Sequence, residues 1–127
     1  GATKLLAMRV RGAATLEDAR KAARAVCRSS LVKAALFGED ANWGRVLAAL
    51  GYSGAAFDPS RVDLWLGDLP LMAAGTPLPL DEEAAAAILK EKSVVFIADL
   101  HAGSAEATAW GCDLTYDYVK INGSYRT

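Results

Sequence analysis

The chain has 127 residues, of which 53% are hydrophobic and 23% charged, and its formal net charge is −1. This composition excludes wholesale disorder and suits one globular domain with its own core. The near-neutral charge gives no reason to expect nucleic acid or an anionic membrane as a partner, and no apolar run approaches the length of a membrane-spanning helix. Cys27 and Cys112 lie in apolar surroundings, which predicts free thiols and a cytoplasmic location.

The first third of the chain predicts a strand followed by a helix. Apolar residues alternate with others over residues 6–10, which is the period of a half-buried strand. Thr15 and Asp18 have the spacing of a capping box, and apolar residues then recur at i, i+3, i+4 and i+7. Ser29 ends this helix. Residues 31–37 are apolar but too few to assign to a strand or a helix.

The helix after Thr15 also has a basic face, made of Arg20, Lys21, Arg24 and Arg28. Such a face can hold an anion. Because charged helix faces are usually solvated, we interpret this one as a solvated surface.

The middle of the chain predicts a short helix and a hairpin. Asn42 is a suitable N-cap for a buried helix that stops at Gly51 as its C′ residue. Residues 62–66 alternate as a strand does, and a turn leads into a second strand over residues 69–73. Pro70 indicates that this second strand lies at a sheet edge.

The last third predicts one helix and two strands. Asp81 caps a helix that runs through residue 89. Residues 93–100 form the strongest strand pattern, and a turn beginning at His101 brings residues 105–110 beside it as a hairpin. With no linker or repeat, residues 1–127 are expected to form a single α+β region, a mixed sheet with helices packed on it.

Several reaction types lack support from motifs. His101 is the single histidine, so neither a His-based triad nor a His-rich metal site is available. The cysteines lack CxxC spacing, and neither GxGxxG nor a P-loop motif supports nucleotide binding. The chain is therefore not expected to hold a complete active site.

Two stretches stand out for their polar residues. In Phe37-Gly-Glu-Asp-Ala-Asn-Trp-Gly-Arg45, four polar residues form either a network that fixes the loop or a ligand site, and we favour a structural cap. They are Glu39, Asp40, Asn42 and Arg45. The closing residues 110–127 interleave aromatic rings with polar side chains, as at a partly wet surface, or as in a terminal element packed on a core.

Both stretches resemble the ornithine acetyltransferase family, the glutamate N-acetyltransferases of arginine biosynthesis. The family motif Phe-Gly-Glu-Asp-Pro-Asn-Trp-Gly-Arg differs here only at Ala41, which leaves the flanking polar residues in place. The family's closing Tyr-Val-basic-Ile-Asn motif and Tyr-Arg-Thr terminus match residues 118–122 and 125–127. Weaker matches extend the resemblance over the whole chain.

The resemblance implies a precursor that cleaves itself and exposes an N-terminal threonine on its β chain. This threonine takes an acetyl group from N2-acetyl-L-ornithine and passes it to L-glutamate, with no metal or organic cofactor. Whether acetyl-CoA also serves as donor stays open. The family's threonine lies well upstream of the Gly-Ala-Thr-Lys segment that opens this chain. We therefore expect the C-terminal part of the β chain, with no catalytic residue in it.

The resemblance also carries two substrate-binding residues, Asn122 and Thr127. An Asn amide offers two donors and an acceptor to an amino-acid substrate, and Thr127 offers a hydroxyl and, as a true C-terminus, a carboxylate for an ammonium group. A turn before Gly123 is the structural alternative for Asn122.

The abrupt start at Gly1 suggests missing upstream polypeptide, where the family has an acidic substrate-binding residue directly before this segment. The implied partners are the α chain and the remainder of the β chain, in αβ heterodimers that assemble into a heterotetramer. Two alternatives stay open: a non-catalytic amino-acid-binding or subunit-association domain, and a structural fragment whose tail seals a core.

Overall fold

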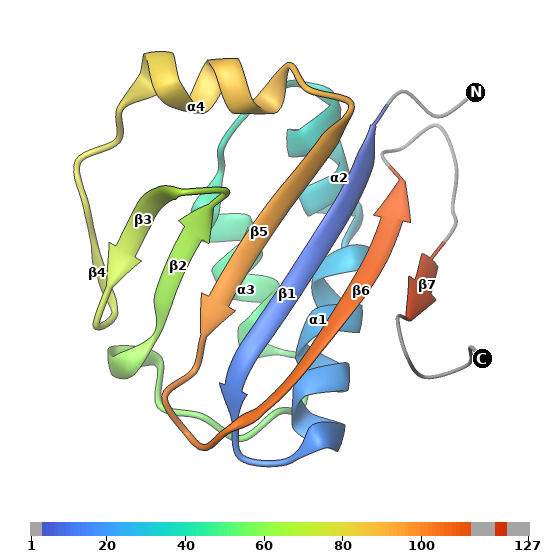
Figure 1. Ribbon diagram of the computed structural model, residues 1–127, viewed down its shortest axis with the longest axis vertical. Coiled ribbons are helices and arrows are strands. Elements are labelled where there is room, and N and C mark those ends of the chain that lie inside the picture. Colours follow the sequence, from blue (N-terminus) through green and yellow to red (C-terminus); the bar gives the residue numbers. More distant parts are fainter. Residues whose placement is uncertain (1–3, 113–118, 122–127) are drawn as a thin grey trace.

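The structure, a computed structural model, describes residues 4–112 and the backbone of residues 119–121. In this part of the chain, one mixed β-sheet carries helices on one face (Figure 1). The predicted α+β class is confirmed. No helix in the described ranges is long and apolar enough to cross a membrane.

The sheet has seven described strands in the order β4-β3-β2-β5-β1-β6-β7. They are β1 (Leu5–Ala13), β2 (Asp63–Leu66), β3 (Leu69–Ala73), β4 (Thr76–Pro77), β5 (Ser93–Asp99), β6 (Ala105–Cys112) and β7 (Val119–Ile121). The central pair, β1 and β5, is parallel, and every other neighbouring pair is antiparallel.

Local capping signals explain where the helices begin. The helices are α1 (Leu16–Arg28), α2 (Ser30–Phe37), α3 (Trp43–Gly51) and α4 (Glu82–Leu89), with a 3₁₀ turn at Pro59–Arg61. The predicted caps Thr15, Asn42 and Asp81 each accept a hydrogen bond from a backbone N–H in the first turn, at 3.0, 3.3 and 3.0 Å. Ser29 ends α1 and caps α2, so the undecided residues 31–37 are helical.

The core lies between the sheet and the helices. Alternate residues of the central strands, such as Leu6, Met8 and Phe96, are at most 3% exposed. They join one apolar cluster with the inner side chains of α1, α3 and α4. In Figure 1, α1, α2 and α3 lie behind the sheet, and α4 crosses one end of it.

The opposite face of the sheet is not covered by any described helix (Figure 1). We call it the open face. Its apolar side chains are only partly buried, and within the described residues they lie outside the core cluster. They are Leu5, Ala7, Trp65, Val95, Ile97 and Trp110. The register places several of them side by side, because Ala7 is opposite both Val95 and Trp110, and Trp65 is opposite Ile97.

The predicted hairpin between residues 93–100 and 105–110 is wrong. Strand β1 lies between β5 and β6, so β6 pairs with β1. The connection crosses the end of β1, where Leu100 N–H donates to Arg11 O (2.9 Å) and Ala102 N–H to Gly12 O (2.7 Å). Tight turn residues therefore fit this crossing as well as they fit a hairpin.

Two smaller expectations need correction. Gly51 is the last residue of α3 and not its C′ residue; Tyr52 caps the helix with φ −96°, so no left-handed residue is needed. The strand containing Pro70 is not outermost, because the two-residue strand β4 pairs with Met72 and Ala73. Since β4 is so short, the ladder ends before it reaches Pro70.

Candidate functional site

The two predicted substrate-binding residues, Asn122 and Thr127, lie outside the described residues. The backbone is described up to Ile121, the last residue of β7, which is opposite Ala109 of β6. The sheet ladder therefore places the backbone of Val119–Ile121, which ends one residue before Asn122.

Asn42 of the motif loop caps α3, as favoured from the sequence, and Glu39 and Arg45 contact neighbouring segments. The Asn42 side chain accepts from the N–H of Arg45 (3.3 Å), and the Arg45 guanidinium donates to the carbonyl of Leu31 (2.8 Å). Arg45 thus ties the first turn of α3 to α2. Glu39 has a left-handed backbone (φ 55°), and its carboxylate turns toward Lys4.

Lys4 joins three parts of the chain. Its side chain is only 8% exposed, and its ammonium lies 3.7 Å from the Glu39 carboxylate. It also donates to the carbonyls of Leu89 and Glu91 at the end of α4, the latter at 3.2 Å. A buried ammonium requires such acceptors, so Lys4 fixes the start of β1 against α4 and the motif loop.

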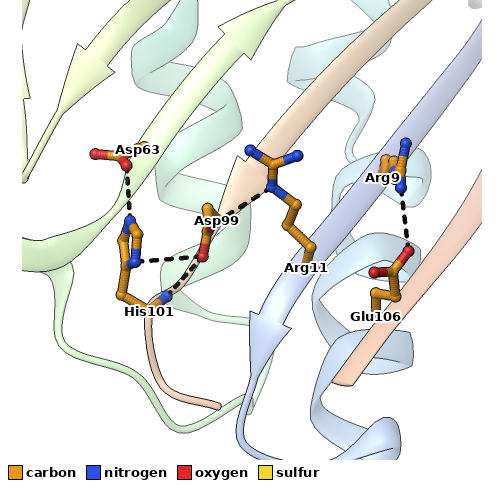
Figure 2. Close-up of polar contacts among 6 residues, drawn as sticks. All are labelled: Arg9, Arg11, Asp63, Asp99, His101 and Glu106. Carbon is orange, nitrogen blue, oxygen red and sulfur yellow. Dashed lines mark hydrogen bonds and ion pairs between the residues drawn. The ribbon is translucent and has the colours of Figure 1, made fainter. Parts of the chain in front are cut away.

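Charged side chains cross the open face in a row from β2 to β6 (Figure 2). The Arg11 guanidinium lies 3.3 Å from Asp99, and His101 Nδ1 lies 3.6 Å from the same carboxylate. His101 Nε2 is 2.6 Å from Asp63. At the other end of the row, Arg9 pairs with Glu106 at 3.2 Å.

Asp63 is held at both of its carboxylate oxygens. Its second oxygen accepts from the N–H of Ala74 at 2.8 Å, where the backbone is left-handed (φ 47°). Burial alone would raise the pKa of Asp63, but the Ala74 and His101 hydrogen bonds and the nearby charges of His101 and Arg11 hold it below its usual value. Asp63 is therefore ionised at neutral pH. It links the turn after β3, which contains Ala74, to the segment after β5, which contains His101.

A shallow hollow lies beside this row. It has a volume of about 240 Å³ and is lined by Arg11, Trp65, Gly67, Asp68 and Ile97. The Arg11 guanidinium lies over the Trp65 ring, 4.9 Å from its centroid, which is a cation–π geometry.

These described groups do not assemble a nucleophile. Both ring nitrogens of His101 face carboxylates, so the ring is engaged as a structural link. Burial raises the pKa of the Cys27 thiol to about 12, so the thiol stays protonated at neutral pH. The described residues also contain no group of three or more His, Cys, Asp or Glu that could hold a metal ion.

Sequence reasoning missed both Lys4 and the charged row. Arg9 and Arg11 alternate with the buried residues of β1, which placed them on one side of the strand. Their partners could not be read from that pattern, since Glu106 and Asp99 come from the far end of the chain.

The ArgJ family model matches residues 1–127. The chain therefore belongs to the ArgJ family, which confirms the resemblance seen in the sequence.

Known relatives are similar over the whole chain. It is 80% identical to the arginine biosynthesis bifunctional protein ArgJ of Symbiobacterium thermophilum, covering 100% of this chain and 32% of that protein. It is 54% identical to the ArgJ protein of Geobacillus stearothermophilus, covering 100% of this chain and 31% of the relative. The chain thus spans about a third of the length of these relatives.

A solved structure matches the fold. The crystal structure of the arginine biosynthesis bifunctional protein ArgJ from Bacillus halodurans superposes with a TM-score of 0.88 at 44% identity. The match covers 93% of this chain and 56% of the crystallised chain. The fold described above is therefore shared with a solved member of the family.

Proposed function

We propose that this chain is the C-terminal part of the β chain of a glutamate N-acetyltransferase. The complete enzyme moves the acetyl group of N2-acetyl-L-ornithine to L-glutamate through an acetyl-threonine intermediate, as one step of arginine biosynthesis. The observation that carries the proposal is the 80% identity, over all 127 residues, to a protein named for arginine biosynthesis.

In this proposal the nucleophile comes from polypeptide outside the chain. An N-terminal threonine can use its own α-amine as base, so the reaction needs no histidine. The positions of His101 between two carboxylates and of the Cys27 thiol in the core agree with a chain that supplies no nucleophile. No metal or organic cofactor takes part, and whether acetyl-CoA is a second donor is not decided by these residues.

Asn122 and Thr127 are the proposed substrate-binding residues. The Asn122 amide would hold the α-carboxylate or α-amine of the substrate, and the terminal carboxylate of Thr127 would face an ammonium group. The pairing of Ile121 with Ala109 supports this role, because an anchored backbone lowers the cost of ordering the next residue.

The open face is the proposed contact with the rest of the protein. Two tryptophans and several aliphatic side chains are only partly buried there, and such a mixed patch is typical of an interface. The α chain and the remainder of the β chain are the proposed occupants, in αβ heterodimers that form a heterotetramer in the cytoplasm. Residues 1–127 would act as a single α+β region within this assembly.

The acetyl-enzyme tests the proposal directly. The complete processed protein is incubated with N2-acetylornithine without glutamate, and each polypeptide is weighed and mapped by mass spectrometry. We expect one acetyl group on an N-terminal threonine outside these 127 residues. No adduct, or an adduct within residues 1–127, would contradict the proposal.

The site residues need a separate test. We expect Asn122→Ala to raise the KM for acetylornithine roughly tenfold or more, because a hydrogen bond to a charged group is lost. A tag fused after Thr127 should also weaken substrate binding while folding stays intact. An unchanged KM in both variants would favour the structural alternative, in which the tail only seals a core.

A further inference from the structure

The outer face of α1 holds a hollow that the proposed acetyl transfer does not use. We call it the basic hollow. It has a volume of about 190 Å³. It is lined by Lys21, Arg24, Ala25 and Arg28 of α1 and by Tyr52 and Ser53 at the end of α3. Lys21, Arg24 and Arg28 follow one another at i, i+3 and i+7, so their side chains lie on one face of the helix.

The positive charge in the basic hollow is not neutralised by the described residues. None of its three cations has an ion pair with a described carboxylate. The nearest acidic residues on α1, Glu17 and Asp18, lie in its first turn, and the Asp18 carboxylate accepts from the N–H of Ala56. Three cations therefore share one concave surface to which the described residues bring no counter-charge.

An unpartnered group points independently to a ligand. The Nε atom of Arg24 is buried and has no hydrogen-bond partner among the described residues. Buried polar groups are nearly always hydrogen-bonded in native proteins, and leaving one unpaired is destabilising. A solvated helix face does not explain this atom, because water does not reach it. An acceptor brought by a ligand satisfies it if the Arg24 side chain turns toward the hollow, a conformation that a bound anion would favour.

The shape and donors favour a phosphate group. A guanidinium presents a planar fork that binds phosphate oxygens in pairs, and an ammonium adds a point charge. A phosphate has enough oxygens to meet Arg24, Arg28 and Lys21 together, and the Tyr52 hydroxyl can also donate. Pockets for drug-sized ligands have volumes of about 300–1,000 Å³, and the volume of this hollow is smaller. It therefore fits a small anion or one terminal group of a larger molecule.

We propose that the basic hollow binds a phosphate-bearing small molecule through Arg24, Arg28 and Lys21. This site lies on the helical layer, whereas the open face is on the other side of the sheet (Figure 1). Its lining shares no residue with the proposed substrate-binding pair Asn122 and Thr127. Free phosphate and the phosphates of a coenzyme-A-type donor share this chemistry, so the experiment must distinguish the two sources.

The test is calorimetric titration of the complete processed protein, without turnover, using inorganic pyrophosphate and coenzyme A as separate probes. We expect saturable binding of at least one probe that weakens with added salt. Tighter binding of coenzyme A would identify a phosphate-bearing cofactor as the source, and tighter binding of pyrophosphate a free anion. Arg24→Gln should weaken binding roughly tenfold or more, since a charge-assisted contact is lost.

The matched control is Arg20→Gln, which removes the same charge from the same helix outside the hollow. It should weaken binding clearly less than Arg24→Gln does, because it removes a neighbouring charge but no side chain that lines the hollow. If Arg24→Gln fails to fold, Arg28→Gln is titrated in its place. The Arg28 side chain is exposed, so this substitution leaves the core unchanged. No binding of either probe, or equal binding by the hollow variants and the control, would overturn the proposal.

Discussion

Neighbouring residues of one strand differ in burial, because their side chains point to opposite faces of the sheet. On the helical face, Leu6 and Leu64 are fully buried in the core cluster. On the open face, their neighbours Leu5 and Trp65 stay partly exposed, and charged side chains form a row across four strands. One face therefore carries the buried core of the fold, and the other carries the apolar and charged groups that we propose as the contact with the rest of the protein. Four substitutions test this division, from the largest expected effect to the smallest.

Leu64→Ala should be the most damaging. It removes a fully buried side chain from the helical face, and such changes lower the free energy of unfolding by about 2–5 kcal/mol. Denaturant unfolding of the complete protein measures it. The control is Leu31→Ala on α2, where the leucine is 61% exposed and the cost should stay within about 0.5 kcal/mol. An equal loss of unfolding free energy in the two variants would contradict the assignment of the core to the helical face.

Trp65→Ala tests the open face as an interface. It removes an aromatic ring and the surface on which the Arg11 guanidinium lies, 4.9 Å from the ring centroid. We expect association with the rest of the protein to weaken by about 1–3 kcal/mol, seen as dissociation of the processed chains in size-exclusion chromatography. Trp65→Phe keeps a ring under the guanidinium and should recover part of the loss. An assembly as stable as the wild type in both variants would argue against a docking role.

Asp63→Asn tests the charged row through pH. The pKa of Asp63 in the folded protein is below its value of about 3.9 in an unfolded chain. The ionised carboxylate therefore contributes stability that is fully present above about pH 4 and is lost as pH falls through the folded pKa. We expect the variant to be about 1 kcal/mol less stable at neutral pH, with a gap that narrows below about pH 4.

Urea unfolding at several pH values measures that gap. Asp68→Asn removes the same charge from an exposed turn nearby and serves as the control. A gap that does not change with pH, or one that widens in acid, would rule out the ionised Asp63 carboxylate as its source.

Arg9→Gln should have the smallest effect. Arg9 and Glu106 are 46% and 56% exposed, and surface ion pairs of this kind contribute little. We expect a change within about 0.5 kcal/mol in denaturant unfolding. A larger loss in the complete protein would mean that the contact with outside polypeptide extends over this end of the row.

The parts of the fold that were predicted correctly have local causes. Thr15, Asn42 and Asp81 each cap a helix through a residue three positions away, so their spacing in the sequence was enough. The strand order could not be predicted in this way. The parallel pairing of β1 with β5 joins segments about 90 residues apart, and no local pattern records which strands become neighbours.

The candidate site was likewise predictable only where its residues are close together in the sequence. The basic face of α1 was visible in the sequence because a helix brings residues at i, i+3 and i+7 together. The link between His101 and Asp63 joins residues 38 positions apart, and Lys4 meets acceptors from two other segments. Such contacts depend on the finished sheet, so residue type alone could not identify them.

The central place of β1 has a consequence for synthesis. Leu5 lies opposite Ser93 on one side and Cys112 on the other, so both neighbours of β1 come from the last third of the chain. At a translation rate of about 5–20 residues per second, this strand waits on the order of 5–20 seconds for the roughly 100 residues that complete its pairing. During that interval its apolar residues and unpaired backbone are open to other chains. The earliest strand of this chain to leave the ribosome is thus among the last to be sheltered.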